Sequence, residues 1–158
     1  MIERIVTNTS PLLALAKMQA FDVIGKLPFE FVCPSEVETE ILVGASQGYE
    51  TEIPNWLKII KLQSNLSPLA VASLDVGEAA VIQLALEQNI ETVCIDELKG
   101  RRAALAVGLK IVGSLGLIGK AKTLGLITEI KPYIEKAKLG GIFYDENLIG
   151  NFLKSLGE

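Results

Sequence analysis

The sequence contains no histidine, and this absence excludes several kinds of catalytic and metal-binding site. Ser–His and Cys–His nucleophile systems need an imidazole base, and zinc and haem sites commonly use histidine as a ligand. Cysteine is nearly as scarce, with Cys33 and Cys94 the only two among 158 residues. They form no CxxC pair, which excludes a disulfide scaffold and a cysteine metal cluster. Both lie in apolar segments, so we interpret them as core residues.

Long hydrophobic runs and a targeting segment are also missing. The first residues carry charge and no apolar stretch that ends in a cleavage site. The apolar stretch from Ala103 to Ile118 is interrupted by Lys110 and by glycines, so it is not a membrane span. We therefore expect a cytoplasmic protein with no membrane contact. The composition, 49% hydrophobic and 22% charged, is that of a folded chain, and the length predicts one domain over residues 1–158.

Basic residues are scarce in the first part of the chain. Residues 1–96 hold 5 Lys or Arg against 13 Asp or Glu, whereas residues 97–138 hold 9 against 3. The net charge of −4 argues against nonspecific binding of nucleic acid, but a basic block after an acidic region is an asymmetry that needs an explanation. The alternative interpretation is that these charges belong to solvated helix faces.

Short apolar strands alternate with helices over most of the chain, which is typical of a parallel sheet covered on both faces. Asn8 to Pro11 has the character of a helix start, with Pro11 at the first helical position. Residues 44–54 are expected to form a loop and 63–73 a connection. The expected strands are 2–7, 29–33, 56–62 (at an edge), 92–95 and 110–112, and the expected helices are 11–19, 20–26, 35–45, 74–88, 97–107, 114–124, 128–138 and 145–156.

Polar side chains follow several of these strands, at the edge of a parallel sheet where sites form. They are Asn8, Thr9 and Ser10 after the first strand, Asp96 and Glu97 after the fourth, and Gly113 and Ser114 after the fifth. Two helices add further acids, namely Glu36, Glu38 and Glu40 on one and Asp75 and Glu78 on the other. Acids that meet in one cleft repel each other and favour a cation, and Mg²⁺ or Mn²⁺ suits a histidine-free set of oxygen ligands. Alternatively, Asp75 and Asp96 cap the helices that they precede and the glutamates face water.

Several segments, in this order and spacing, resemble the PIN-domain proteins, small metal-dependent ribonucleases that include the toxins of the VapBC toxin–antitoxin class. The chain looks most like the short prokaryotic PIN-like proteins. The resemblance falls within residues 5–127 and is most specific from Leu74 to Ile127. It is carried by IVTNTSPLLALAK, CPSEVETEIL, LDVGEAAVIQLALE and VCIDELKGRRAALAVGLKIVGSLGLIGKAKTLGLI.

This resemblance implies a three-layer α/β/α sandwich with a five-stranded parallel sheet, and it also implies roles for particular residues. The first acid of the family falls on Asn8, the second on Glu40, the third on Glu78 with Asp75 as the alternate, and the fourth on Asp96 with Glu97 beside it. Ser114 matches a small hydroxyl residue near the cluster, and Thr9 or Ser10 could support it. Asn8 departs from the family, because an amide can hold Mg²⁺ through its oxygen but adds no negative charge.

The function implied is hydrolysis of RNA phosphodiester bonds, with one or two Mg²⁺ or Mn²⁺ ions held by Glu40, Glu78, Asp96 and Asn8. The basic residues Lys99, Arg101, Arg102, Lys120 and Lys122 would hold the RNA backbone. By resemblance we expect a homodimer and an antitoxin protein as partner. Two alternatives stay open: a PIN-like domain without catalysis that binds protein or RNA, and a metal-free nucleotide-binding domain. The glycines at 113, 116 and 119 before Lys120 lack P-loop spacing and favour a closely packed helix instead.

Overall fold

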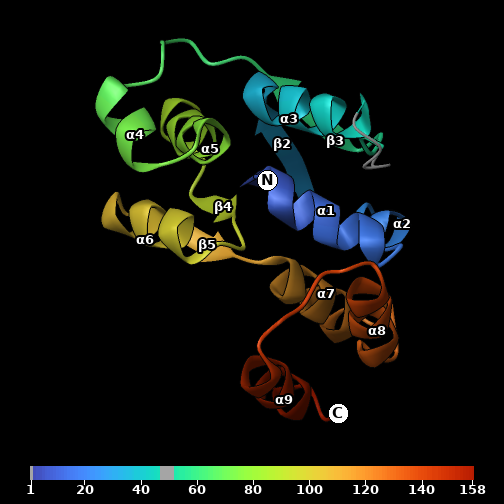
Figure 1. Ribbon diagram of the computed structural model, residues 1–158. Helices are drawn as coiled ribbons and strands as arrows, with labels where there is room; N and C mark the ends of the chain where they lie inside the picture. Colours follow the sequence, from blue (N-terminus) through green and yellow to red (C-terminus); the bar gives the residue numbers. More distant parts are fainter. Residues whose placement is uncertain (1, 47–51) are drawn as a thin grey trace. The chain divides into compact units, whose positions relative to one another are not determined.

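The computed structural model describes residues 2–46 and 52–158, and the chain divides into two compact units (Figure 1). The first unit consists of Met1–Leu13 and Pro28–Gly113, and the second of Ala14–Leu27 and Ser114–Glu158. Helix α1, Thr9–Lys17, begins in the first unit and ends in the second. The expectation of a single domain over residues 1–158 stays a prediction.

The first unit contains a five-stranded sheet in which all strands are parallel, in the order β3-β2-β1-β4-β5. Val6 of β1 pairs with Val32 of β2 on one side and with Val93 of β4 on the other. The sheet is flanked by helices, so the predicted α/β class with a five-stranded parallel sheet is confirmed. The strands are β1 Glu3–Thr7, β2 Phe29–Pro34, β3 Leu57–Ile60, β4 Thr92–Cys94 and β5 Lys110–Val112.

The central strands β1, β2 and β4 are short apolar runs because both of their faces are covered. Val6, Val32 and Val93 are fully buried. Strand β3 lies at one edge, as predicted, and its Lys58 is exposed. Charged residues on an edge strand reach solvent and discourage pairing with another sheet.

Three longer helices of the first unit pack on this sheet, and a short helix, α4, comes directly before α5 in the sequence. Helix α5, Val76–Glu87, contacts β1, β2 and β4, whereas α3, Ser35–Ser46, contacts β2 and β3, and α6, Leu98–Ala106, contacts β5. The predicted connection over 63–73 was wrong in part, because Pro68–Ser73 forms helix α4. None of the residues of α4 is buried, so it has no apolar periodicity from which a helix could be predicted.

Several smaller boundary predictions were also wrong. Pro11 is the third residue of α1 and not its first, and β2 extends to Pro34, one residue beyond the predicted strand, whereas α3 begins at Ser35 as predicted. Helix α3 continues to Ser46, two residues beyond the predicted start of the loop at Gly44, and residues 47–51 of that loop lie outside the described part of the chain. Such shifts of one or two residues at an element's end are common.

The second unit is helical and consists of the end of α1 with α2 Phe21–Ile24, α7 Ser114–Thr123, α8 Lys131–Leu139 and α9 Glu146–Ser155. Gly119 of α7 packs against Phe152 of α9 so closely that a Cβ there would lie 2.5 Å from the ring. This contact confirms the predicted close helix packing at Gly119, whereas Gly113 precedes α7 and lies against Asp96 and Arg101. The Glu158 carboxylate accepts a hydrogen bond from Lys122 at 2.8 Å and one from the Ile130 backbone N–H at 2.9 Å.

Among the described residues, none of the helices has the length and apolar character that a membrane crossing requires.

Candidate metal centre

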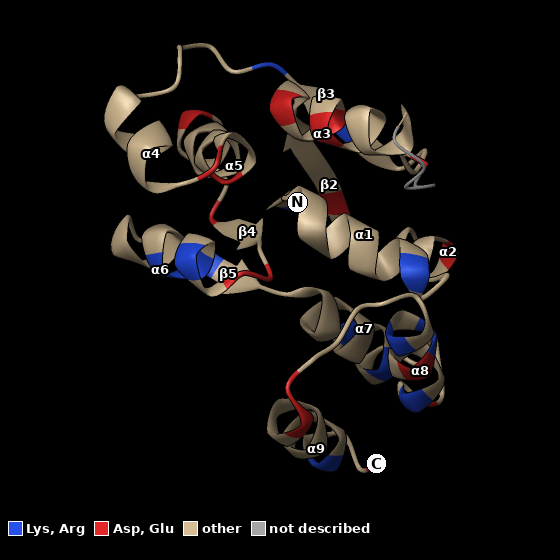
Figure 2. Cartoon of the chain, in the orientation of Figure 1, with Lys and Arg blue, Asp and Glu red and all other residues tan. Residues whose placement is uncertain are grey.

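The carboxyl ends of β1 and β4 lie side by side and bring together the residues that follow them. The Asn8 backbone N–H donates a hydrogen bond to the Cys94 carbonyl at 3.0 Å, so Asn8 after β1 lies beside the start of the segment that contains Asp96 and Glu97. In a parallel sheet, this edge is where ligand sites form. Acidic positions lie on α3, at the start of α5 and after the end of β4, where the chain is red in Figure 2.

Three carboxylates form the centre of the site. Asp75, Glu78 and Glu97 each have a carboxylate oxygen within 4.8 Å of the oxygens of the other two. Two of them are fixed by the start of α5, where the Glu78 N–H donates to Asp75 Oδ1 at 2.7 Å and the Asp75 N–H donates to Glu78 Oε1 at 3.3 Å. This reciprocal arrangement is a capping box, which satisfies backbone donors at the helix start. The predicted cap at Asp75 is therefore confirmed, and the same cap aims both acids at Glu97.

Glu78 is the most unusual member of this group because it is buried, with only 3% of its surface exposed. Its Oε1 accepts from Asp75, but Oε2 has no hydrogen-bond partner among the described residues. Burial is the main cause that raises the pKa of Glu78, and the charges of Asp75 and Glu97 raise it further. The site therefore holds a buried carboxylate oxygen that is short of a positive partner.

Glycine at position 100 makes this burial possible. A Cβ on Gly100 would lie 2.7 Å from Glu78 Oε2 and 2.9 Å from the Ile95 side chain. Helix α6 can therefore approach the start of α5 only because residue 100 has no side chain. Gly100 therefore contributes to the site through the close approach that it allows.

Glu40 adds a fourth carboxylate from α3. Its Oε2 accepts a hydrogen bond from Thr9 Oγ1 at 2.8 Å, and its side chain lies against Gly77, where a Cβ would collide with Oε1. Burial raises the pKa of Glu40, and so do the charges of Asp75 and Glu97. The contact with Gly77, which lies between Asp75 and Glu78, places Glu40 beside the three-carboxylate group.

Asn8 and Ser10 complete the edge of the site at the end of β1. Asn8 is 4% exposed, and its Oδ1 has no hydrogen-bond partner among the described residues. Ser10 Oγ donates to Glu97 Oε1 at 3.0 Å. Thr9 and Ser10, both predicted as supporting residues, therefore each donate to a different carboxylate from the first turn of α1.

Asp96 is surrounded differently from Glu97. A Cβ on Gly113 would lie 2.9 Å from Asp96 Oδ1 and 2.9 Å from Arg101 Nη1. Because both atoms lie so close to one point, the Asp96 carboxylate and the Arg101 guanidinium are near each other. Arg101 is half-buried, and its Nη1 donates to the Ile95 carbonyl at 3.0 Å. The structure thus brings Asp96 next to a fixed cation, whereas Glu97 joins Asp75 and Glu78. The suggestion that Asp96 caps the next helix was wrong, because Glu97 occupies the N-cap of α6.

The other predicted residues are placed as follows. Lys99 and Arg102 are exposed on α6 in the first unit, and Lys120 is exposed on α7 in the second. Ser114, also in the second unit, is fully buried, with its hydroxyl 2.7 Å from Tyr144 Oη. Glu36 and Glu38 are half-buried on α3. The roles assigned to these residues stay predictions.

The two cysteines take no part in the site. Both are fully buried, and burial raises the pKa of the Cys33 thiol to about 12 and raises that of Cys94 as well. A thiol that holds its proton this firmly is a poor nucleophile and a poor metal ligand. Their predicted place in the core is confirmed.

The donor set fits a hard divalent cation. It is made only of carboxylate and amide oxygens, and two of these, on Asn8 and Glu78, are buried without a hydrogen-bond partner among the described residues. Mg²⁺ and Mn²⁺ prefer such oxygen ligands. A cation here would also offset the repulsion among carboxylates that share one cleft.

The fold is an all-parallel α/β sheet, and a cluster of acids without histidine lies at the carboxyl ends of its strands. A protein of this class can bind a divalent metal at that edge of the sheet. A family model described as a PIN domain matches residues 4–158. The chain therefore belongs to the PIN-domain family, whose members are typically metal-dependent nucleases. Comparison with curated proteins finds no match.

Sequence reasoning did not predict which acids meet. It treated Glu97 as a neighbour of Asp96 and Asp75 as an alternate for Glu78, whereas Asp75, Glu78 and Glu97 form one group. The spacing of Asp75 and Glu78 is that of a capping box, and this signal could have indicated that both carboxylates are held at the same helix start. The glycines at 77, 100 and 113 that make room for side chains carry no local signal of that role.

Proposed function

We propose that the protein is a ribonuclease that hydrolyses RNA phosphodiester bonds with the help of Mg²⁺ or Mn²⁺. The observation that carries the proposal is the group of three carboxylates within 4.8 Å of one another, in which Glu78 Oε2 is buried without a partner among the described residues. Such a group costs free energy unless a cation joins it. Membership of the PIN-domain family supports the same reaction.

Asp75, Glu78 and Glu97 would hold the ion, with Glu40 and Asn8 beside them. When bound, the ion would supply Lewis acidity, which lowers the pKa of water and offsets charge on the scissile phosphate. Thr9 and Ser10 hold the carboxylates of Glu40 and Glu97 in place by hydrogen bonds of 2.8 and 3.0 Å.

The exposed basic residues of α6 would hold the phosphates of the substrate. Lys99 and Arg102 are exposed there, whereas Arg101 is half-buried and donates to the Ile95 carbonyl. Phosphate contacts of this kind come from Lys and Arg and fix the position of a nucleic acid without reading its sequence. We therefore assign Lys99 and Arg102 to the substrate and Arg101 to the support of Asp96.

The test is cleavage of a pool of labelled single-stranded RNA with Mg²⁺, with Mn²⁺ and with EDTA. We expect cleavage that needs metal and that is lost in Asp75→Asn and Glu97→Gln. Asp96→Asn is the matched comparison for Glu97→Gln, because the two acids are adjacent but only Glu97 belongs to the three-carboxylate group. A rise in melting temperature on addition of Mn²⁺, reduced in Glu97→Gln, would report metal binding without activity. Absence of both cleavage and a shift in melting temperature would refute the proposal.

A second candidate, a PIN-like domain without catalysis, is favoured by Asn8. This residue provides a neutral amide where the family resemblance implies an acid, so the cluster carries one negative charge fewer. Metal binding without cleavage of any RNA, including total cellular RNA, would support this candidate.

The proposal also includes a role as a toxin with a cognate antitoxin, and a homodimeric state. Co-purification tests the antitoxin, and sedimentation measurements test the dimer.

A further inference from the structure

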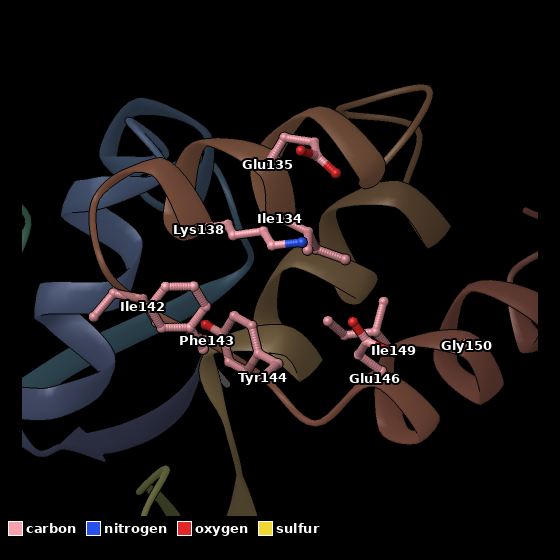
Figure 3. Close-up of a pocket in the computed structure, with 9 residues that line it drawn as sticks. All are labelled: Ile134, Glu135, Lys138, Ile142, Phe143, Tyr144, Glu146, Ile149 and Gly150. Atoms are coloured by element: carbon pink, nitrogen blue, oxygen red, sulfur yellow. The ribbon is translucent and has the colours of Figure 1, made fainter.

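A cavity of about 270 Å³ lies within the second unit, between α8, α9 and the segment that joins them (Figure 3). Its apolar lining includes Ile134 of α8, Ile142 of the joining segment and Ile149 of α9. Ile134 is 6% exposed and so belongs to the core of this unit. The cavity is therefore a recess over the core, with enough space for one small ring system.

Two aromatic residues from the joining segment line the same recess. Tyr144 is held by the contact of its hydroxyl with Ser114 at 2.7 Å, whereas Phe143 is 73% exposed. A phenyl ring so exposed at the rim of a recess is free to stack on a planar ligand. Stacking of this kind is how proteins hold unpaired bases without regard to their sequence.

The rim of the cavity carries charges of both signs. Lys138 and Glu135 come from α8 and Glu146 from the start of α9, and all three are exposed. None of them forms an ion pair with another described residue. Lys138 and Ile134 lie four residues apart on α8, and both line the recess (Figure 3), so a cation and an apolar surface take part in the same lining. A matching ligand combines an anionic group, an aromatic ring and hydrogen-bond donors.

We propose that this cavity binds one unpaired nucleotide of a single-stranded RNA. The base stacks on Phe143, Lys138 contacts a phosphate, and Glu135 or Glu146 accepts a hydrogen bond from an exocyclic amino group. Carboxylates accept from the amino group of cytosine in this way, and uracil has no such donor. The inference rests on the proposed function for its substrate class, RNA, and adds a site that prefers amino-bearing bases.

The test is binding of fluorescently labelled oligocytidine and oligouridine in EDTA, where metal-dependent cleavage is absent, measured by fluorescence anisotropy. We expect tighter binding of oligocytidine, and about tenfold weaker binding in Phe143→Ala. Leu139→Ala is the matched control, because Leu139 is 89% exposed in the same region but does not line the cavity. Lys138→Ala should weaken binding of both oligonucleotides, with Lys154→Ala on α9 as its charge-matched control. Glu146→Gln with Glu135→Gln should remove the preference for cytosine.

The outcomes separate this site from the proposed catalysis. Equal affinities of wild type and Phe143→Ala, or equal affinities for the two oligonucleotides, would overturn the inference even if the protein cleaves RNA. Cytosine-selective binding that depends on Phe143, from a protein that cleaves no RNA, would support the site and refute the ribonuclease. If no oligonucleotide binds and Phe143→Ala instead alters self-association in sedimentation, the cavity serves a protein contact and the inference is wrong.

Discussion

Substitution of Glu78 by Gln should stabilise the metal-free protein. Glu78 is 3% exposed, its Oε2 has no hydrogen-bond partner among the described residues, and Asp75 and Glu97 lie within 4.8 Å. Glutamine keeps an oxygen that can accept from the Asp75 N–H, removes the buried charge, and replaces the unpartnered Oε2 by an NH2 group that can donate to the nearby Asp75 or Glu97 carboxylate. An unsatisfied buried polar group costs about 1–3 kcal/mol. Because Asp75 and Glu97 are exposed, solvent screens their repulsion, and we expect the gain to stay within that range.

The gain should depend on pH in a direction fixed by the raised pKa of Glu78. In the unfolded chain a glutamate has a pKa of about 4.3, so between that value and the folded pKa the folded state binds more protons. Wild-type stability therefore falls as pH rises through this window, and the full cost of the charge is present above the folded pKa. The advantage of Glu78→Gln should be full above the folded pKa and should fade as pH falls toward the unfolded pKa.

Glu87→Gln is the matched control, because Glu87 ends the same helix but has the opposite shift. Its carboxylate accepts from the Gln63 N–H at 2.8 Å and the Ser64 N–H at 3.2 Å, and these hydrogen bonds lower its pKa. Glu87→Gln should therefore lose stability at neutral pH, and the loss should vanish below the folded pKa.

The assay is thermal and urea unfolding of the three proteins in EDTA, followed by circular dichroism at several pH values. For a chain of this size, each kcal/mol changes the melting temperature by about 2–4 °C. Addition of Mn²⁺ should reverse the order, since the cation binds wild type more tightly than Glu78→Gln. If Glu78→Gln in EDTA is as unstable as Glu87→Gln, or if its effect is the same at every pH, the reasoning is refuted.

Three further predictions concern other parts of the chain. Gly77→Ala should displace Glu40, whose Oε1 occupies the space of the new methyl group, and so weaken Mn²⁺ binding in a calorimetric titration. Unchanged Mn²⁺ affinity would contradict this placement. Arg101→Gln should lower the melting temperature because the hydrogen bond from Arg101 to a backbone carbonyl is lost. Arg102 is exposed, so Arg102→Gln should weaken RNA binding and leave the melting temperature unchanged. The opposite pattern would show that Arg101 contacts the substrate. Glu158→Gln should destabilise the protein by about 1 kcal/mol, because the Glu158 carboxylate accepts hydrogen bonds from the backbone at the start of α8. Urea unfolding measures this change, and an unchanged midpoint would argue that these hydrogen bonds do not stabilise the fold.

Most of the fold could be predicted from the sequence because its signals are local. Apolar runs such as the one around Val32 predict a covered parallel strand, and the run that ends at Cys94 predicts another. Helix α5 could be predicted from its apolar face and from the Asp75 cap. Helix α4 could not, since it buries no side chain and therefore shows no periodicity.

The candidate site was only partly predictable. The sequence indicates which acids follow the strands and which start the helices, because these places are fixed by each acid's position along the chain. It does not indicate whether Asp96 or Glu97 turns toward Asp75, because adjacent residues point in different directions and their neighbours come from distant segments. The place of Arg101 beside Asp96 also depends on the missing side chain at Gly113, a residue of another element.

The sequence by itself determined the kind of chemistry available. Without histidine and with two buried cysteines, only oxygen ligands are left, and alternating strands and helices place them at one edge of a parallel sheet. The tertiary structure decided which oxygens share a centre, which carboxylate is buried, and which cation supports a neighbour. These properties depend on distances between side chains that lie far apart in the sequence, and packing fixes such distances only when the whole chain is folded.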